Sequence, residues 1–313
     1  MKNKVKLSFI ISLPRSGSTL LQRILMRHDK IDSIAEPWIL LPLAYSLKSL
    51  GTRTTYSHSI SSRGLRDLIK LMPNQEDDYY KYAGKFAAQL YASQIKSEGN
   101  YFLEKTPKYY LILPEIVKMF PDAKFIFLFR NPVQIYASFL STWGNNSFGK
   151  LHKWGHYYNL THGYKMLSDG YELLKDRSYG IQYEKFVSDP EKYTEKILNY
   201  LELDHQDSLT DDIRAQEIKG SNVDPKVKQY KNVDKRSLSG WKNVFNSSYR
   251  KSIIKNYVEG LSEQTLSIQG YDKATILKEI DELKTNGKHN LVKDIYEFNK
   301  VKLISRYSLL SFS

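Results

Sequence analysis

The side chains best suited to chemistry near the start of this sequence form a short polar loop. The loop consists of Arg15, Ser16, Gly17, Ser18 and Thr19. If a helix begins here, its first N–H groups lack carbonyl acceptors and the helix dipole favours a negative charge. Arg15 adds a fixed positive charge and the three hydroxyl groups add hydrogen-bond donors. These residue types predict a binding site for a phosphate-like anion.

The flanking sequence predicts a strand before this loop and a helix after it. Residues 5–11 alternate and then fill with β-forming side chains, whereas Leu20, Leu21, Ile24 and Leu25 recur at helical spacing. This order is the one that places loop amides at a helix start. A serine-rich helix cap with no ligand explains the same residues, so both interpretations stay open at this point.

The loop departs from the strict nucleoside triphosphate pattern Gly-x-x-x-x-Gly-Lys-Ser/Thr. That pattern needs a glycine near Ser12 and a lysine after Gly17, where this chain has Ser18. The lysine of the pattern contacts the terminal phosphates of the triphosphate. Its absence favours a ligand with a shorter phosphate chain.

A second cation lies at the end of a buried strand. Residues 124–130 have a continuous apolar core that ends at Arg130, as is typical of a strand covered on both faces. Asn131 and Pro132 then break the strand and start a helix. Ligands bind beyond the carboxyl ends of parallel strands, so Arg130 is a candidate ligand contact. The alternative is an arginine in a surface ion pair.

The remaining sequence alternates strands and helices, which indicates the α/β class with a parallel sheet. Further strands are expected at residues 31–34, 101–103 and 178–182. Helices are expected at residues 112–120, 133–140, 151–176, 190–203, 249–260, 273–286 and 290–300. Ser188 or Asp189 is the expected cap of the helix at 190–203. Residues 218–246 lack periodicity and are expected to form a long functional loop.

Composition limits the class of protein. The 313 residues are 41% hydrophobic and 26% charged, as in a globular protein. No apolar run approaches the roughly 18 residues of a membrane span. The first residues lead directly into a strand rather than a signal-peptide core, so a cytoplasmic location is the default expectation. The chain has no cysteine, which excludes disulfides, thiolate metal ligands and a cysteine nucleophile.

The formal charge of +13 calls for an anionic partner or a basic surface. Nucleic acid is not expected, because the basic residues are scattered and no nucleic-acid-binding motif is present. A phosphorylated cofactor, an acidic acceptor or an anionic membrane surface explains the charge equally well. No metal site is expected, because the seven histidines form no ligand cluster. His152 and His156 share a predicted helix face but lack a third ligand.

Several motifs in order resemble the sulfotransferases that use 3′-phosphoadenosine-5′-phosphosulfate (PAPS). Residues 13–21 are similar to the 5′-phosphosulfate loop of that family, and residues 127–133 with 136–139 resemble its 3′-phosphate motif. Residues 183–187 resemble a third block, and residues 236–245 resemble a late block that contains Gly-Trp-Lys-Asn. The resemblance implies a P-loop-like three-layer fold with a central parallel sheet flanked by helices. It implies one domain over residues 1–313, with a core at about 5–245 and a helical extension at about 246–313.

The resemblance also implies where the donor binds. Arg130 and Ser138 correspond to the residues that contact the 3′-phosphate, and Tyr183 to a residue that meets the adenine. Lys235 and Arg236 lie where late contacts to the 3′-phosphate occur, although Lys-Arg-Ser here replaces the usual Arg-Lys-Gly. The full set of expected donor contacts is Arg15, Ser16, Gly17, Ser18, Thr19, Leu20, Arg130, Ser138, Tyr183, Lys235 and Arg236. PAPS is the expected sulfuryl donor and no metal is expected.

Sulfuryl transfer needs a base for the acceptor proton and cations for the charge that develops on the bridging oxygen. Arg15 and Lys105 are the expected cations. In the small-molecule branch the block Lys-Thr-His supplies a histidine base, but this chain has Pro107 in that place. Glu36 in Ala-Glu-Pro-Trp resembles the glutamate base of the tyrosylprotein and heparan branches. The alternative is that Glu36 only pairs with a nearby cation such as Arg15.

The acceptor is expected to be a carbohydrate hydroxyl, because the blocks around Glu36 and Lys105 resemble the glycan branch more closely. A protein tyrosine or a small phenol or alcohol is the alternative. The expected acceptor walls are the loop at residues 38–82 and the aromatic region at 143–158. A P-loop kinase or NTPase is the rival enzyme class, and an anion-binding module without catalysis is the rival outside enzymes.

Overall fold

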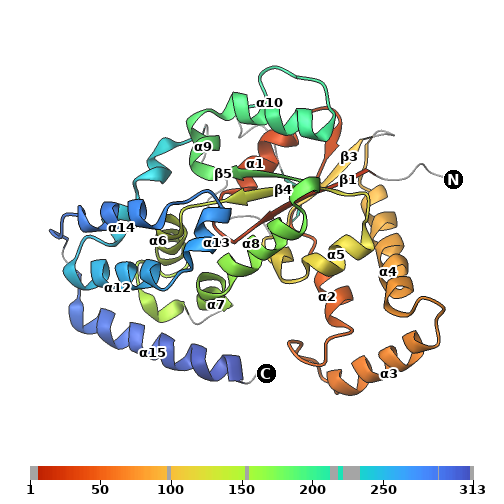
Figure 1. The fold of residues 1–313 in the computed structure, drawn as a ribbon, viewed down its shortest axis with the longest axis horizontal. Coiled ribbons are helices and arrows are strands. Elements are labelled where there is room, and N and C mark those ends of the chain that lie inside the picture. The colour runs from red at the N-terminus through yellow and green to blue at the C-terminus, as the bar shows by residue number, and fades with distance from the viewer. Residues whose placement is uncertain are drawn as a thin grey trace.

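A computed structural model of the chain describes residues 6–96, 100–151, 155–211, 218–220, 233–287 and 289–310, with side chains through residue 304. Within these residues one parallel sheet is covered by helices on both faces (Figure 1). The α/β fold with a central parallel sheet predicted from the sequence is therefore confirmed. No helix in the described ranges combines the length and apolar character needed to cross a membrane.

The sheet has the strand order β2-β3-β1-β4-β5, and all neighbouring strands are parallel. Its strands are β1 (Lys6–Ser12), β2 (Ile31–Asp32), β3 (Tyr101–Glu104), β4 (Lys124–Phe129) and β5 (Ser178–Gln182). In the central strand β1, Phe9 is paired with Glu104 of β3, and Ile10 is paired with Ile126 of β4. The strand order reverses at β1, and ligands bind at the carboxyl ends of strands beside such a reversal.

Helices connect the strands and continue after β5. Between β1 and β3 they are α1 (Ser18–Leu25), α2 (Leu40–Tyr45), α3 (His58–Lys70) and α4 (Gln75–Ala92). Between β3 and β5 they are η1 (Tyr109–Leu111), α5 (Leu113–Met119), α6 (Pro132–Thr142), η2 (Phe148–Lys150), α7 (His156–Thr161), α8 (Gly163–Leu173) and η4 (Lys175–Arg177), where η marks a 3₁₀ helix. After β5 they are α9 (Tyr183–Ser188), α10 (Pro190–Leu201), η7 (Lys235–Leu238), α11 (Trp241–Val244), α12 (Ser248–Glu259), α13 (Glu263–Ile268), α14 (Lys273–Asp281) and α15 (Leu291–Leu310).

The two faces of the sheet contribute to two hydrophobic clusters. Phe9 and Ile11 of β1 belong to the larger cluster, which also contains buried side chains of α4, α5, α6 and α8. Ile10 of β1 and Leu128 of β4 belong to the smaller cluster, against α1, α9 and α10. Because both faces of β4 are covered, its sequence is apolar at nearly every position rather than at alternate ones.

Residues 38–82, predicted as a loop, are largely helical, so that prediction was wrong. The structure places α2, α3 and the start of α4 there. In α3, Leu65, Leu68 and Ile69 recur at helical spacing, a signal that the loop prediction overlooked. The buried face of α4 includes Ala83 and Ala87 between tyrosines, and these small side chains give a weak apolar signal. Tertiary packing therefore decides α4 more than its own sequence pattern does.

Other differences concern short elements. The described part of residues 218–246 contains η7 and α11, so the prediction of one irregular loop was wrong there; residues 221–232 lie outside the described residues. The helix α13 was not predicted, and the strand expected at 31–34 is reduced to β2. Elements of one or two turns are too short to show a hydrophobic period. Asp189 is confirmed as the cap of α10, since its side chain accepts a hydrogen bond from the amide of Lys192.

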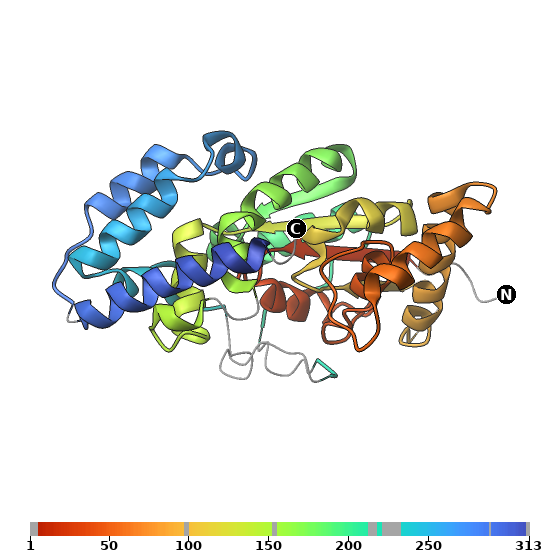
Figure 2. The same cartoon turned by 90° about the horizontal axis from the view of Figure 1, so that it is seen from below.

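The helices after residue 246 share the larger hydrophobic cluster with the sheet. Ile253 and Ile254 of α12 and Val301 of α15 are buried in it. Figure 2 shows α12, α13 and α14 in blue at one end of the molecule, α15 in dark blue running from that end towards the middle, and α3 and α4 in orange at the other end. The region expected as a helical extension thus packs on the same core.

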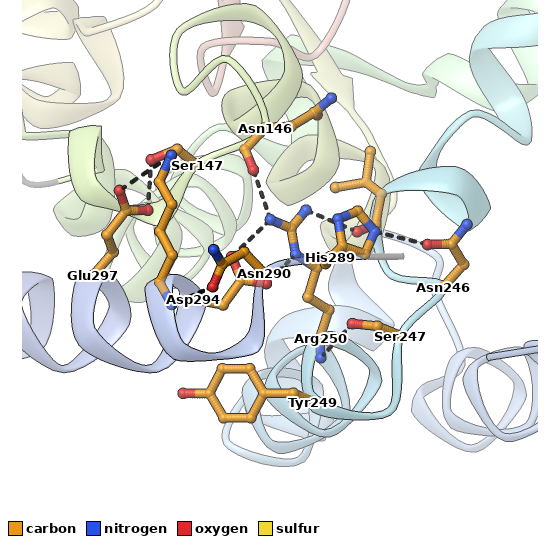
Figure 3. A network of polar contacts seen from close by, with 12 residues as sticks. Asn146, Ser147, Asn246, Ser247, Tyr249, Arg250, His289, Asn290, Asp294 and Glu297 are labelled. Atoms are coloured by element: carbon orange, nitrogen blue, oxygen red, sulfur yellow. Dashed lines mark hydrogen bonds and ion pairs between the residues drawn. The ribbon is translucent and has the colours of Figure 1, made fainter. Parts of the chain in front are cut away.

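A buried ion pair connects α15 to α12 (Figure 3). Arg250 donates two hydrogen bonds to the carboxylate of Asp294, at 2.7 and 2.8 Å, and both side chains are almost fully buried. Arg250 also donates to the carbonyl of Asn146 at 2.7 Å, and Ser147 donates to Glu297 of α15 at 2.6 Å. The last helix is therefore fastened both to α12 and to the segment that follows α6.

Candidate functional site

The residues expected to form the site follow the carboxyl ends of the strands. The polar loop with Arg15 follows β1, Lys105 follows β3, Arg130 follows β4 and Tyr183 follows β5. Glu36 lies shortly after β2. Because all five strands are parallel, these segments leave the sheet at the same edge. The fold therefore gathers five separate parts of the sequence in one region.

The loop after β1 presents free amides at the start of α1. The amides of Ser16 and Leu20 already donate to loop carbonyls, at 3.2 and 3.0 Å. The amides of Gly17, Ser18 and Thr19 lie at the helix start, where α1 provides no carbonyl acceptor. The structure thus brings the amides of Gly17, Ser18 and Thr19 to the helix start as expected, whereas the amides of Ser16 and Leu20, also expected as donor contacts, already donate to the carbonyls of Leu13 and Gly17.

Arg15 is oriented by the end of α6. Its Nε lies 3.1 Å from Ser138 Oγ, and its Nη2 lies 3.2 Å from Thr142 Oγ1. Its guanidinium carbon is 5.3 Å from the ring centre of Trp143, which adds a cation–π contact. The backbone of Arg15 has a φ of 70°, a conformation that costs a non-glycine residue roughly 1–3 kcal/mol. The three contacts from α6 help to stabilise it.

Arg130 is buried beneath the same loop. Its side chain is 8% exposed and donates to the carbonyl of Arg15 at 2.9 Å, to the carbonyl of Ser237 at 3.0 Å and to Gln134 Oε1 at 3.1 Å. All three acceptors are neutral, in contrast to the surface ion pair considered from the sequence. A guanidinium has five N–H donors, so two remain for a ligand. Ser138 contacts the side chain of Arg15, whereas Arg130 contacts its main chain.

Tyr183 packs directly against Gly17. A Cβ atom on Gly17 would lie 2.3 Å from Tyr183 Cε2, and Gly17 has a φ of 93°, so only glycine fits this position. The guanidinium of Arg130 lies 4.2 Å from the ring centre of Tyr183. The hydroxyl of Tyr183 is 2.9 Å from Ser237 Oγ. Tyr183 therefore contacts the loop after β1, Arg130 at the end of β4 and Ser237 of η7.

Glu36, Lys105 and Thr19 meet at the other side of the helix start. The Nζ of Lys105 lies 2.7 Å from Glu36 Oε1 and 3.2 Å from Thr19 Oγ1. Lys105 is only 1% exposed, whereas Glu36 remains 17% exposed. The second carboxylate oxygen of Glu36 accepts from Trp38 Nε1 at 3.2 Å. A partly exposed carboxylate and a buried ammonium thus lie together at the start of α1.

Lys235 and Arg236, the basic residues of the late block, do not lie with the other expected site residues. Arg236 is exposed and its Nη2 pairs with Asp234 at 2.8 Å; Lys235 is exposed as well. The neighbouring Ser237 makes the inward contacts, through its carbonyl to Arg130 and its hydroxyl to Tyr183. In this structure, Lys235 and Arg236 therefore point to solvent, one position away from the residue that contacts the site.

A buried carboxyl group lies beneath Lys105. Glu104 is 1% exposed; its Oε1 accepts from Thr106 Oγ1 at 2.9 Å, and its Oε2 has no partner among the described residues. Burial raises the pKa of Glu104 to about 8. Near neutral pH this carboxyl group is therefore largely protonated, and it does not compete with Glu36 for the charge of Lys105.

Some contacts were not expected from the sequence. Thr142 follows Ser138 by one helical turn, a spacing that could have indicated a second hydroxyl on the same face of α6. Trp143 lies in the aromatic region expected as an acceptor wall, and its ring stacks on that of His156 with centres 4.4 Å apart. Ser237 carries no sequence signal beyond its place in the late block. His152 lies outside the described residues.

No group of three or more potential metal ligands occurs in the described parts of the chain. The cationic groups Arg15, Lys105 and Arg130 are instead the main positive charges at this edge of the sheet. The arrangement can bind two anionic groups: one at the amides of α1 and one beside Arg130. Between Glu36 and the helix start it offers a carboxylate that can accept a proton.

Comparison with known proteins identifies the family. Residues 8–207 match the sequence model of the family described as "Sulfotransferase family", so the chain belongs to the sulfotransferases. This confirms the PAPS-dependent sulfotransferase family expected from the sequence motifs.

Two relatives illustrate the range of similar sequences. The nodulation protein NoeE of Sinorhizobium fredii is 33% identical over 140 residues, which cover 44% of this chain and 31% of NoeE. A protein-tyrosine sulfotransferase of Drosophila melanogaster is 25% identical over 217 residues, which cover 66% of this chain and 40% of that protein. This chain thus spans about a third of the length of these curated relatives.

Solved structures support the fold. The sulfotransferase domain from the curacin biosynthetic pathway has a TM-score of 0.56 and 18% identity, over 85% of this chain and 96% of that domain. The sulfotransferase domain of the Synechococcus PCC 7002 olefin synthase has a TM-score of 0.55 and 23% identity, over 87% and 97%. Both have the same α/β arrangement over most of their length.

Proposed function

We propose that this chain transfers the sulfuryl group of PAPS to a carbohydrate hydroxyl, with Glu36 as the general base. The observation that carries the proposal is the meeting of Glu36 and Lys105 with Thr19 at the start of α1. A base, a cation and free helix amides are the three groups that in-line sulfuryl transfer requires. They come from segments that are far apart in the sequence.

The donor would bind along the strand ends from β1 to β5. The amides of Gly17, Ser18 and Thr19 suit the 5′-phosphosulfate, because they combine unpaired donors with the positive end of α1. The two remaining N–H groups of Arg130 suit the 3′-phosphate, for which a planar guanidinium offers paired donors. Tyr183, between Gly17 and Arg130, lies where the adenosine would connect these two anionic groups.

The reaction would follow from this placement. The acceptor oxygen attacks sulfur, and the bond between sulfur and the bridging phosphate oxygen breaks on the opposite side. Glu36 takes the hydroxyl proton as the new oxygen–sulfur bond forms. Lys105 and Arg15 stabilise the negative charge on the departing phosphate oxygen, and 3′-phosphoadenosine-5′-phosphate (PAP) is released.

Lys105 has two tasks in this scheme. Its Nζ lies within 3.2 Å of both Glu36 and Thr19, which belongs to the helix start where the phosphosulfate would bind. As the bridging oxygen gains charge, the ammonium can shift its hydrogen bond from Glu36 to that oxygen. Glu36 then becomes more basic at the moment when it must accept the proton.

The acceptor class rests on motif similarity. The Ala-Glu-Pro segment at Glu36 and the Glu-Lys-Thr-Pro segment at Lys105 resemble the glycan branch of the family. A protein tyrosine is the second candidate, because a protein-tyrosine sulfotransferase is among the relatives. Both acceptors present a hydroxyl group next to a surface that can stack on aromatic rings such as Trp38 or Trp143.

Donor binding can be tested by calorimetry with PAP and with ATP plus Mg²⁺. We expect tight, metal-independent binding of PAP, because the loop lacks the lysine of triphosphate-binding proteins. A preference for ATP with Mg²⁺ would contradict the proposal and favour a kinase or NTPase. Binding of PAP without any sulfuryl transfer would favour an anion-binding module.

Transfer can be tested with PAPS that carries a labelled sulfuryl group, against a panel of oligosaccharides and tyrosine peptides. We expect label in the oligosaccharides. The variant Glu36→Gln should lower kcat by about 10²- to 10⁴-fold with unchanged affinity for PAP. Glu202→Gln, in an exposed ion pair with Lys124, is the matched control and should retain full activity. Near-normal turnover of Glu36→Gln would remove Glu36 as the base.

A further inference from the structure

A half-buried lysine on the segment after β3 has no acidic partner among the described residues. Lys108 follows Lys105 by three positions, and its Nζ donates to Asn159 Oδ1 at 2.5 Å. Asn159 is 1% exposed, and the same oxygen accepts from the hydroxyl of Tyr110 at 2.6 Å. Among the described residues no carboxylate lies within ion-pair distance of Lys108. Asn159 therefore fixes the ammonium in place without neutralising it.

The surroundings of Lys108 make its positive charge costly. Burial lowers the pKa of Lys108 to about 8, and no acidic group offsets this effect. Burial and the charge of Lys108 together lower the pKa of His156 to about 4, so this neighbour is neutral at physiological pH. A half-buried cation without a counter-charge is disfavoured, because its lost hydration is not offset by attraction to an opposite charge. A bound anion would offset the desolvation cost of the Lys108 ammonium.

Neighbours of Lys108 contact the segments that carry the proposed reacting groups. The ring of His156 stacks on Trp143, and Trp143 lies against the guanidinium of Arg15. On the other side, Tyr109 accepts a hydrogen bond from the amide of Leu40, just after the segment that carries Glu36. Lys108 thus lies between the two segments expected to form the acceptor walls.

The ammonium group also has room for a ligand. A Cβ atom built on the exposed Gly155 would find Lys108 Nζ at 3.8 Å and, among the described residues other than its chain neighbours, no other atom within 4 Å. The lysine is thus reachable from the side of Gly155, while Asn159 and Tyr110 hold it from within.

We propose that Lys108 binds an anionic group of the acceptor, and that the acceptor is an acidic glycan that carries carboxylate or sulfate groups beside the hydroxyl. This inference rests on the proposed sulfotransferase activity and adds the acceptor's charge to it. Lys108 is a specificity-determining residue in this account. It pairs with the acceptor anion, which supplies a counter-charge that the described residues do not provide.

The test compares an acidic oligosaccharide with its neutral counterpart, in which the carboxylates are reduced to alcohols. For the wild type we expect a KM at least about tenfold lower with the acidic form, since a charge-assisted hydrogen bond contributes about 1.5–3 kcal/mol. Lys108→Met should remove this preference with little change in kcat and in PAP affinity. Lys108→Arg should retain part of it. The exposed Lys165→Met on α8 is the matched control and should leave the preference intact.

A second variant covers the case in which Lys108→Met does not fold. Asn159→Asp places a carboxylate against the ammonium and neutralises it without removing it, so the acidic preference should again be lost. An unchanged preference in both variants, or a wild-type preference for the neutral oligosaccharide, would overturn the proposal. A stronger response to acidic peptides than to acidic glycans would overturn the glycan assignment.

Binding without turnover separates the two proposals. In calorimetry with PAP present, the acidic oligosaccharide should bind the wild type at least about tenfold more tightly than Lys108→Met. If this difference appears but no sulfuryl group is transferred, the transferase proposal fails and the anion site stands. If transfer occurs but the difference is absent, the anion site fails alone.

Discussion

The ammonium of Lys105 lies 2.7 Å from the carboxylate of Glu36, and the two residues differ sharply in exposure. Lys105 is enclosed by the protein, whereas Glu36 reaches the surface. A buried charge depends on its partner more than an exposed one does. Glu36 therefore has a structural task as well as its proposed chemical one, and the two can be separated by mutation.

Removing the charge of Glu36 alone should destabilise the protein more than removing both charges. Glu36→Gln leaves Lys105 buried without a counter-charge, and loss of one partner of a buried pair costs up to about 3–5 kcal/mol. In Glu36→Gln/Lys105→Met the orphaned ammonium is gone, so the free energy of unfolding should recover by about 1 kcal/mol or more. Urea unfolding of the wild type, both single variants and the double variant measures this coupling. Strict additivity would show that the two side chains do not interact.

Gly17→Ala should destabilise the protein by roughly 1–3 kcal/mol and weaken PAP binding. The added methyl group meets Tyr183 at 2.3 Å, and the φ of 93° disfavours any side chain. Thermal unfolding and PAP calorimetry measure the two effects. Gly64→Ala is the control: it lies within α3 with nothing within 4 Å, so the same substitution should be neutral or stabilising. Equal effects at both glycines would contradict this account of the loop.

Arg130→Met should weaken binding of PAP by about 10- to 100-fold, because a charged hydrogen-bonded contact to the 3′-phosphate is lost. Adenosine 5′-monophosphate, which lacks that phosphate, provides the comparison, since its affinity should change much less. Calorimetry with both nucleotides gives the ratio. If both affinities fall equally, Arg130 acts only by holding the carbonyl of Arg15, which it contacts at 2.9 Å.

Glu104 should make the stability of the protein depend on pH. Its folded-state pKa of about 8 lies above the ordinary value of 4.5, so the folded state retains a proton that the unfolded state releases. Its contribution to stability is fully present below pH 4.5 and falls as the pH rises towards 8. Glu104→Gln removes this dependence. The difference in unfolding free energy between variant and wild type should therefore grow in favour of the variant from pH 5 to 8, as urea titrations at several pH values would show.

Most of the sheet and the central part of the site could be predicted from the sequence. Residues 124–130 are apolar because both faces of β4 are buried, and Arg130 ends that strand as expected. The loop with Gly17 lies between a strand and a helix with clear periods. Glu36 and Lys105 were both expected at the site; the cation suggested as a partner for Glu36 was Arg15, and the structure places Lys105 against it.

Other contacts depend on tertiary packing that no local pattern records. The buried face of α4 contains alanines between tyrosines, so its sequence shows only a weak helical period of apolar residues. Ser237 contacts Arg130 through its main-chain carbonyl, a group that every residue has. Only the three-dimensional structure shows that no carboxylate among the described residues pairs with Lys108.

The buried ion pair between Arg250 and Asp294 is also connected to the segment that follows α6. Arg250 holds the carbonyl of Asn146, and Glu297 of α15 holds Ser147, 150 positions earlier in the sequence. This segment directly follows Trp143 of the α6 end, which contacts Arg15. The position of the Arg15 side chain is therefore linked, through Trp143 and the segment after α6, to the packing of α15. Changes that loosen α15 should therefore disturb Arg15, and with it both the proposed turnover and the proposed donor contact, well before any loss of fold.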